Sequence, residues 1–502
     1  MNAKDTEILA ERRAVLAQRL DTMGDLSAPV IKGSNLRYEM STRVQAMAYG
    51  GIGLIDSLVR SIGLAEKVDA RVNVFKRHFP YFESDHVLNL AYNVVTGGSR
   101  LEDLERLRSD PSYLDALGCD RIPDPTTAGD FLRRFDEEQI DQLQESINDA
   151  RVKIWKNYLS RAELKLACID ADGTIAPTSG QCKEGMDVSY KGEWGYAPLL
   201  VSLANTNEVL YLKNRSGNRP SHEGAVKYMD KAVALARRGG FKKVRLRGDT
   251  DFSLTHNFDR WHDGGVEFVF GMDASKTLIA HGDKLEKTVW QKLERPVRIP
   301  TGERAQRANV RDQIVIERGY TNIVLEEEKI AEFSYSPAAC KNTYRVVTLR
   351  KLVRIEEHQM LLAYRLYEFF YITNVSKAVL SAEEVVFQAN ARCNQENVIE
   401  QLKNGVQAMR MPADTLLSNW AYMVIAGLAW NLKIWLGLSH PDRERGQQIR
   451  RMEFRGFVAH VIMVPCQIVR TGRQVIARIL NATEWAPTLI DGLSHYRQWR
   501  PT

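Results

Sequence analysis

Short apolar runs that alternate with helical segments between residues 164 and 272 constrain the fold of this chain more than any other feature. The run LKLACIDADGTI ends in acidic residues, as a buried strand can, and GYAPLLVSLAN and EVLYLKNR follow it. The turn signal Asn205-Thr206-Asn207 separates the last two runs, so the three predict a meander of strands. A helix over 222–238, a strand in KKVRLRGDTDF, a short helix through Trp261 and a strand in VEFVFGM are expected next.

Three meander strands followed by helix, strand, helix and strand is the element order of an RNase H-like α/β core. Around it, apolar residues spaced by three and four predict helices from Arg43 to Trp155 and again after Pro412. Residues 1–35 are expected to be loosely ordered. The stretches TYRVVTLRKLVRI and MLLAYRLYEFFYITN are rich in β-branched and aromatic residues, which favours strands. We therefore expect a helical N-terminal region over 1–160, the first part of the core over 161–274, a β-rich insertion over 275–378, a core helix over 379–410 and a helical C-terminal region over 411–502.

The composition is that of a soluble globular protein, with 26% charged and 44% hydrophobic residues in 502 and a net charge of +6. This mild positive excess is compatible with a nucleic-acid partner. No CxxC pair occurs among the six cysteines, so a zinc knuckle is unsupported. The N-terminus has no apolar signal region, and the apolar stretch Leu416–Leu438 carries Asn419, Asn431 and Lys433. We expect a buried helix there and a cytoplasmic protein.

Four acidic residues fall at the ends of two predicted strands: Asp170 and Asp172 at one, and Asp249 and Asp251 at the other. Strand ends of an α/β sheet are where ligands collect, and carboxylate oxygens are the ligands that Mg²⁺ prefers. Two such ions about 3.5–4 Å apart can promote phosphoryl transfer. A site of this kind needs a third carboxylate from another segment. Spacing alone does not decide which aspartate of each pair would bind metal.

The predicted helix after the insertion offers that carboxylate. At about 100° per residue, Arg392, Glu396 and Lys403 lie within roughly 40° of one another, while Val398 and Leu402 can face the core. The carboxylate could bind metal and the two cations could hold phosphates. The alternative is that these are ordinary surface ion pairs. Glu400, about 80° away around the helix, is the alternative to Glu396.

The order IDADGT, RGDTDF and then R-x3-E-x6-K behind a β-rich insertion resembles the insertion-sequence DDE transposases with a Tyr-Arg-Glu-Lys signature. The closer similarity is to the bacterial insertion-sequence family numbered thirteen-eighty, and it spans about residues 45–480. The segments that carry it are ENVIEQLKNG, YITN, FRGFVAHVIMVPCQIVRTGRQV, SRLEDLERLRSDP and PDPTTAGDFLRRF.

This resemblance implies that Asp172, Asp249 and Glu396 are the catalytic residues and bind two Mg²⁺ ions, for which Mn²⁺ can substitute. It implies that Arg392 and Lys403 bind DNA phosphates. The implied activity is cut-and-paste transposition by a homodimer on double-stranded DNA, both the terminal inverted repeats of the element and the target. The signature tyrosine falls at Ala389, so its contact would be absent or supplied elsewhere.

Several further residues are candidates for DNA contact. Arg133 and Arg134 are expected on a helix that follows PDPTT, in the N-terminal region 1–160, which would bind DNA. Asp124 or a nearby threonine can cap this helix, and a helix–turn–helix and a plain helical bundle both fit. From Lys284 to Arg318 nine basic residues outnumber five acidic ones, which suits DNA or simply a solvated face. The candidates in that run are Trp290, Arg304, Arg307 and Arg311.

The C-terminal region adds eight arginines between Arg443 and Arg478, whose helical spacing could follow phosphates. Trp420, Trp430 and Trp435 are expected in the core or in a dimer contact. Two other functions remain open: an RNase H-like nuclease, and a DNA-binding protein descended from a transposase. The acidic triad argues against the second, and the insertion with its flanking helical regions argues against the first.

Overall fold

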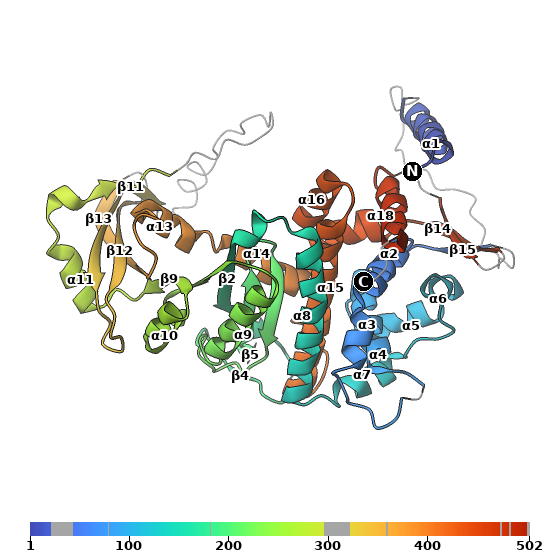
Figure 1. Ribbon diagram of the computed structural model, residues 1–502, viewed down its shortest axis with the longest axis horizontal. Helices are drawn as coiled ribbons and strands as arrows, with labels where there is room; N and C mark the ends of the chain where they lie inside the picture. The colour runs from blue at the N-terminus through green and yellow to red at the C-terminus, as the bar shows by residue number, and fades with distance from the viewer. Residues whose placement is uncertain are drawn as a thin grey trace.

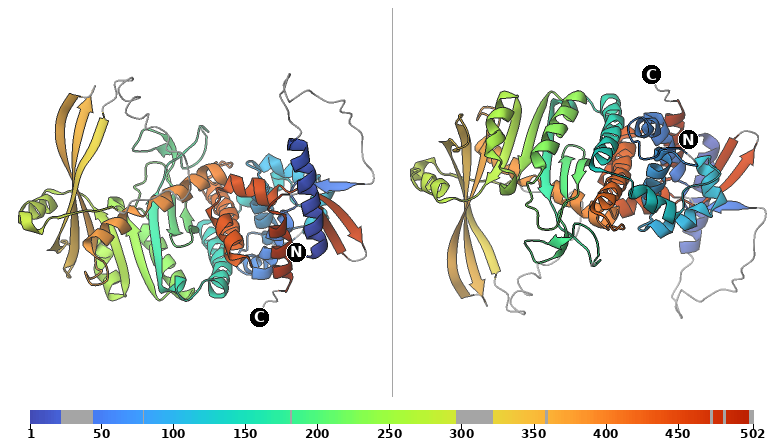
Figure 2. Two further views of the ribbon diagram at one scale, coloured as in Figure 1. Left: turned by 90° about the horizontal axis from the view of Figure 1, so that it is seen from above. Right: turned by 90° about the horizontal axis from the view of Figure 1, so that it is seen from below.

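The computed structural model describes residues 1–21, 44–78, 80–180, 182–295, 322–357, 360–471, 474–480 and 483–498. The protein is a mixed α/β structure with a long sheet at its centre (Figure 1). The strands of the insertion lie at one end of the molecule, and the N-terminal and C-terminal helices lie together at the other (Figures 1 and 2).

The five predicted core strands are confirmed and lie side by side in the order β7-β6-β2-β8-β9. The strand β2 pairs antiparallel with β6, which pairs antiparallel with β7, so these three form the predicted meander. On its other edge β2 is parallel to β8, and β8 is parallel to β9. Their bounds are β2 Leu166–Gly173, β6 Leu199–Leu203, β7 Glu208–Lys213, β8 Lys243–Gly248 and β9 Val266–Met272.

The two predicted connecting helices are also present. The first, α9 (Ala225–Arg238), joins β7 to β8 and packs on β2, β6, β7 and β8. The second, α10 (Phe258–Asp263), joins β8 to β9 and packs on β9. Parallel strands require such crossover connections, which explains why a helix follows β7 and another follows β8. The carboxyl ends of β2 and β8 consequently meet at one edge of the sheet.

The insertion extends the central sheet. Its last strand pairs antiparallel with β9, from Phe370 opposite Met272 to Thr373 opposite Val269. The sheet therefore continues through β13, β12, β11 and β10 beyond the core strands. The insertion elements in the described segments are α11 Lys276–Asp283, β10 Gln291–Lys292, β11 Asn322–Tyr335, β12 Tyr344–Glu357 and β13 Met360–Thr373.

The N-terminal region is helical, and the expectation of loose order over residues 1–35 is wrong for its first part. Residues Ala3–Asp21 form the helix α1, because the segment is rich in alanine, leucine, glutamate and arginine, all strong helix formers. The described side chains of α1 are mostly exposed. The helices that follow are α2 Ile52–Ile62, α3 Leu64–Asp69, α4 Glu83–Val95, α5 Leu104–Arg108, α6 Pro111–Leu117, α7 Pro125–Leu132 and α8 Glu137–Tyr158.

The long helix α15 (Leu416–Ser439) is the predicted buried helix. It is long and apolar enough to cross a membrane, but nearly all of its side chains are buried against α8, β7, α4 and α16. The side chains of Trp420, Trp430 and Trp435 on this helix are fully buried, and each indole N–H donates a hydrogen bond within the protein. They are therefore core residues and offer no surface for a dimer contact. The neighbouring helices are α13 Ala382–Asn390, α14 Cys393–Glu400, α16 Arg443–Arg451, α17 Phe454–Phe457 and α18 Ala486–Gln498.

The C-terminal region is not helical throughout. Strands β14 (Cys466–Thr471) and β15 (Gln474–Ile479) pair with each other, and β14 also pairs with β1 (Gln45–Met47) near the N-terminus. Helical spacing therefore describes the tail arginines on α16 and α17 but is wrong for Arg470 and Arg478, which lie on β14 and β15. This segment is rich in β-branched residues, which favour a strand. Arg470, on β14, forms an ion pair with Asp115 of α6.

Candidate active site

Two of the three predicted catalytic acids lie at the meeting point of β2 and β8. Asp172 is the penultimate residue of β2, and Asp249 directly follows β8. One guanidinium nitrogen, Nη2 of Arg392, lies 3.3 Å from Oδ2 of Asp172 and 3.8 Å from Oδ2 of Asp249. Because both carboxylates approach the same nitrogen, their Oδ2 atoms point at one shared position.

The backbone after β8 orients Asp249. This residue caps the short 3-10 turn Thr250–Phe252, and its Oδ1 accepts a hydrogen bond of 3.0 Å from the backbone N–H of Asp251. The other oxygen stays free to face Arg392. Asp251 contributes its backbone to this arrangement, while its own side chain is exposed. Of the two acids that spacing left open here, Asp249 is therefore the one that faces Asp172.

Asp170 is engaged elsewhere. It is fully buried, and both of its carboxylate oxygens accept hydrogen bonds from Arg247 of β8, at 2.7 and 2.8 Å. Arg247 also donates to the backbone oxygen and side-chain oxygen of Gln388 in α13. This buried pair ties two core strands to the helix that precedes Arg392. It leaves Asp172 as the acid of its pair that shares a position with Asp249.

The electrostatics of the pair are unbalanced. Burial raises the pKa of Asp172 to about 6; Arg392 opposes the shift, whereas the charges of Asp249 and Glu396 add to it. Burial also raises the pKa of Asp249, again against the effect of Arg392. One guanidinium thus fails to compensate carboxylates that are partly withdrawn from water and close to one another. Such acids bind a further cation favourably.

The predicted continuous helix over 379–410 is interrupted. α13 ends at Asn390, α14 begins at Cys393 with Arg392 as its N-terminal cap, and a π-helical turn, Gln401–Gly405, follows α14. The angles expected for Arg392, Glu396 and Lys403 assumed one regular helix and do not apply here. Breaks and π-turns of this kind commonly accompany functional sites.

Glu396 lies in the first turn of α14 and is exposed. Its charge reaches Asp172, where it helps to raise the pKa of that carboxyl. Within the described residues, however, no three histidine, cysteine, aspartate or glutamate side chains are grouped closely enough to hold a metal ion. Its role as third ligand therefore stays a prediction. Glu400, the alternative, accepts a hydrogen bond of 2.6 Å from Asn404.

The two aspartates by themselves fit a divalent cation. Carboxylate oxygens are the ligand type that Mg²⁺ prefers, and two of them face one position that the positive charge of Arg392 takes up. The guanidinium thus marks a place where a cation is electrostatically favoured. A complete magnesium site would need Glu396 or another oxygen ligand to join this pair.

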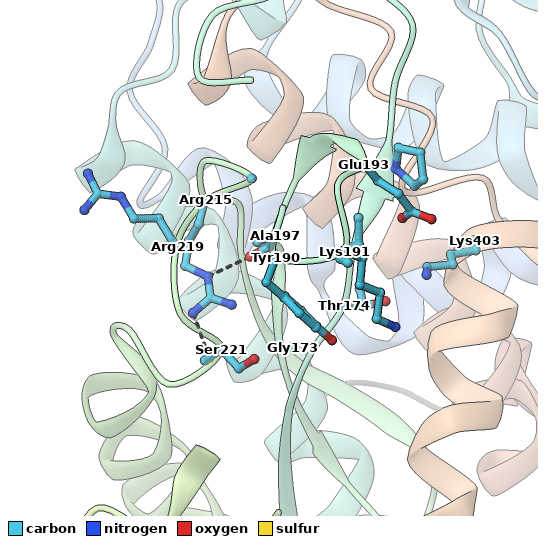
Figure 3. A pocket seen from close by; sticks show the side chains of 13 residues that line it. Gly173, Thr174, Tyr190, Lys191, Glu193, Ala197, Arg215, Arg219, Ser221 and Lys403 are labelled. Carbon is cyan, nitrogen blue, oxygen red and sulfur yellow. Dashed lines mark hydrogen bonds between the residues drawn. The ribbon is translucent and has the colours of Figure 1, made fainter. Parts of the chain in front are cut away.

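In the part of the chain that the structure describes, the other residues predicted to bind phosphate or DNA form no ion pair with Asp172 or Asp249. Lys403 lines a cavity next to Thr174, just beyond Asp172 in the chain (Figure 3). Trp290 is partly buried, and the guanidinium of Arg350 lies 4.2 Å from the centre of its ring. Arg304, Arg307 and Arg311 lie outside the described residues.

The predicted cap before Arg133 is confirmed, but the helix is shorter than expected. Asp124 caps α7 by accepting a hydrogen bond from the N–H of Thr127, and α7 ends before Arg133. Arg133 pairs with Asp130 and Asp414, and Arg134 covers the ring of Phe75 at 5.3 Å. Both arginines therefore have partners within the protein, and their binding of DNA stays a prediction.

Sequence reasoning missed two features of the site. One is Arg247, whose contacts link Asp170 to α13. An arginine inside a predicted buried strand needs a partner, and this requirement could have pointed to Asp170. The other is the cavity beside Thr174, to which the segment SYKGEW contributes an aromatic and a basic residue. At the signature tyrosine position, Ala389 packs beside the insertion, in an apolar cluster that includes Val269 and Val386.

The structure combines a mixed α/β sheet with a carboxylate pair at its strand ends. A family model described as transposase DDE domain group 1 matches residues 35–501. The chain therefore belongs to this family of DDE transposases, a family that suggests an enzyme that cleaves DNA.

Other comparisons add little. No curated protein matches the chain. Among solved structures, a piggyBac transposase synaptic complex with hairpin DNA is similar at 11% identity, covering 83% of this chain and 86% of that chain, with a TM-score of 0.32. A TM-score this low carries no argument about the fold.

Proposed function

We propose that this transposase performs cut-and-paste DNA transposition and is related to the bacterial insertion-sequence family numbered thirteen-eighty. The observation that carries the proposal is the convergence of Asp172 and Asp249 on one cation position, 3.3 and 3.8 Å from a single nitrogen of Arg392. The core is proposed to be RNase H-like. Its strand order β7-β6-β2-β8-β9, with an antiparallel meander followed by two parallel strands, supports that assignment.

Asp172, Asp249 and Glu396 are the proposed metal-binding and catalytic residues. When bound, two Mg²⁺ ions would supply the Lewis acidity that activates the attacking oxygen and stabilises the leaving oxygen of a phosphodiester. The aspartates are held in place by their strands and by the turn after β8. The charge of Glu396 helps to raise the pKa of Asp172, which supports its place as the third acid; α14 would have to move to bring its carboxylate to the pair.

Arg392 and Lys403 are the proposed phosphate-binding residues on the DNA. Arg392 pairs with the two aspartates in this structure, and it would exchange them for a phosphate when the aspartates bind metal. A planar guanidinium suits phosphate oxygens, which can accept two parallel hydrogen bonds from it. Lys403 would hold the strand on the Thr174 side of the pair.

The proposed partner is double-stranded DNA, both the terminal inverted repeats and the target. The N-terminal helices and the β-rich insertion are the proposed additional DNA contacts. A homodimer on DNA is proposed because an element has two ends and each chain has one candidate site; closed twofold symmetry is the commonest way to present two identical sites. The buried tryptophans of α15 do not support this dimer, so its interface must lie elsewhere.

The experiment is a cleavage and strand-transfer assay with duplexes that carry the element's own ends. In Mg²⁺, Asp172→Asn, Asp249→Asn and Glu396→Gln should each slow cleavage about a hundredfold or more, because each loses an anionic ligand. The matched controls are Asp251→Asn and Glu400→Gln, which lie close by in the chain and should cleave normally.

Each result decides one part of the proposal. Cleavage without transfer of the new 3′ end would identify a nuclease of the same fold. End binding without any cleavage by the wild-type protein would identify a DNA-binding derivative. Normal cleavage by Glu396→Gln, together with loss in Glu400→Gln, would move the third ligand to Glu400.

A further inference from the structure

A small sheet projects from the chain between β2 and β6, next to the candidate site. Its strands are β3 (Ala176–Pro177), β4 (Asp187–Val188) and β5 (Trp194–Tyr196), in the order β3-β5-β4. Between this sheet, the loop after β7 and the π-turn that carries Lys403 lies a cavity of about 350 Å³ (Figure 3). Gly173 and Thr174, the residues that directly follow Asp172, form part of its wall.

The cavity is strongly basic. Lys191, Arg215, Arg219 and Lys403 line it, against a single acid, Glu193. Figure 3 shows the cations arriving from opposite sides, with Arg215 and Arg219 on one side and Lys403 on the other. Burial lowers the pKa of Lys403; the charges of Glu400 and Glu193 oppose this shift, and the charge of Lys191 adds to it. Cations crowded in this way favour an anionic ligand between them.

One of these cations has a donor without a partner. Arg215 is only 4% exposed, and it donates through Nε to the oxygen of Ala197 at 2.7 Å and through Nη1 to the oxygen of Ser221 at 2.8 Å. Its Nη2 is buried and has no hydrogen-bond partner among the described residues. Buried polar groups are almost always hydrogen-bonded, so an unmatched guanidinium nitrogen in the wall of a cavity indicates a missing acceptor.

An aromatic residue stands among the cations. The side chain of Tyr190 is 84% exposed, and Nζ of Lys191 lies 5.6 Å from the centre of its ring. Figure 3 shows Tyr190 between the arginines and Lys403. Exposed aromatic rings beside cations are the combination that binds unpaired nucleotides, because the ring stacks on a base while the cations hold the backbone.

We propose that this cavity binds one unpaired nucleotide of the DNA strand next to the cleaved phosphate, with its phosphate on the cations and its base stacked on Tyr190. The inference rests on the proposed transposase function and names the strand conformation that the site accepts. The cavity volume lies at the lower end of the ~300–1,000 Å³ typical of small-ligand sites, which suits one nucleotide. The wall formed by Gly173 and Thr174 places that nucleotide beside Asp172.

The test measures binding of a fluorescein-labelled single-stranded oligothymidylate to the full-length protein in EDTA, by anisotropy. Tyr190→Ala should weaken binding about tenfold, as loss of one base–aromatic stack does, whereas Tyr190→Phe should stay within about twofold of wild type. Trp194→Ala is the matched control. It removes an aromatic side chain that is 57% exposed on the same small sheet but does not line the cavity. Binding of a blunt duplex should be unchanged by Tyr190→Ala.

The results separate this inference from the proposed function. Equal weakening by Tyr190→Ala and Trp194→Ala, or no weakening by either, would overturn the nucleotide site even if the protein cleaves element ends. Loss of duplex and single-strand binding together would show a general basic surface and would also overturn it. A specific Tyr190 effect in a protein that cleaves no DNA would uphold the nucleotide site and overturn the proposed function.

Discussion

Two carboxylate clusters in this protein, one fully buried and one only partly buried, have similar residues and opposite character. In the first, at the contact of α8, β7 and α15, Glu208 receives four hydrogen bonds. They come from Nε of Arg151 (3.0 Å), Nε1 of Trp155 (2.7 Å), Oγ1 of Thr206 (2.6 Å) and Nε1 of Trp435 (2.7 Å). In the second, Asp172 and Asp249 share one arginine at 3.3 and 3.8 Å.

The difference between them lies in the supply of donors. Glu208 has a cation and three neutral donors for its two oxygens, so this carboxylate is fully hydrogen-bonded. The aspartate pair has less positive charge than it needs, and burial raises the pKa of both carboxyls. A buried carboxylate with all its donors is part of the architecture, whereas a partly buried carboxylate pair that lacks them is a candidate ligand site.

The largest expected effect on stability comes from breaking the cluster around Glu208. Glu208→Gln should lower the free energy of unfolding by about 3–5 kcal/mol, because it leaves the fully buried Arg151 as an uncompensated charge. Asp172→Asn should change it by less than about 1 kcal/mol, since it removes a carboxylate that burial and its acidic neighbours already disfavour. Thermal and urea unfolding of the two variants measure this contrast. The opposite ranking would show that the aspartate pair is the structural one.

The sequence predicted the strands at this site better than it predicted the contacts. The runs ending in IDADG and RGD are apolar and bounded by turn residues, so strands β2 and β8 and their acidic ends follow from local pattern. Asp170 and Asp172 could not be separated, because both alternate to the same face. What separates them is Arg247, a partner 77 residues away in the chain.

Non-local contacts also explain the errors. The angle argument for Arg392, Glu396 and Lys403 assumed a regular helix, and the break before Cys393 and the π-turn after Glu400 change their directions. The cavity beside Thr174 joins a small sheet, a loop and that π-turn, which no sequence window contains. The strand β14 was mistaken for helix although it is rich in β-branched residues and pairs with β15 directly after it; only its other partner, β1, is distant in the chain.

Lys433 is a third kind of buried ionisable group, because its hydrogen bonds go to backbone oxygens and to no carboxylate. Its Nζ donates to the backbone oxygens of Arg450 and Met452, and burial lowers its pKa to about 7. Between about pH 7 and 10.5 the unfolded chain binds a proton that the folded protein has lost, so stability rises with pH across this window.

Lys433→Met removes that titration. The stability of wild type relative to Lys433→Met should therefore rise by about 2 kcal/mol from pH 7 to pH 9. Unfolding of both proteins at the two pH values measures the difference, and global effects of pH cancel. A constant difference would mean that Lys433 keeps its proton and that the two backbone oxygens suffice for a buried charge.

A smaller effect on stability is expected when Arg392 is removed from the aspartate pair. Arg392→Gln leaves the two aspartates without the cation that competes for their shared position. Mg²⁺ should then bind the free protein about tenfold more tightly and add about 1 kcal/mol to the stabilisation seen at saturating metal. Cleavage should fall, because the proposed phosphate contact is lost. Asp172→Asn is the control and should show no stabilisation by Mg²⁺.

The smallest change in stability is expected at an exposed charge cluster, where water solvates the charges. Arg133 pairs with Asp130 at 2.9 Å and with Asp414 at 3.3 Å, and all three side chains are at least half exposed. Arg133→Ala should therefore cost less than about 0.5 kcal/mol of stability, since exposed ion pairs contribute little.

If Arg133 also binds a DNA phosphate, its loss should appear in the salt dependence of binding. The slope of log affinity against log salt should fall by about one for any duplex sequence, because one fewer counterion is released. Arg108→Ala is the matched control, since Arg108 forms a comparable exposed pair with Glu105 in a neighbouring helix. An equal change of slope in both variants would assign the effect to net charge. An unchanged slope in Arg133→Ala would show that Arg133 pairs only with Asp130 and Asp414 and does not bind a DNA phosphate.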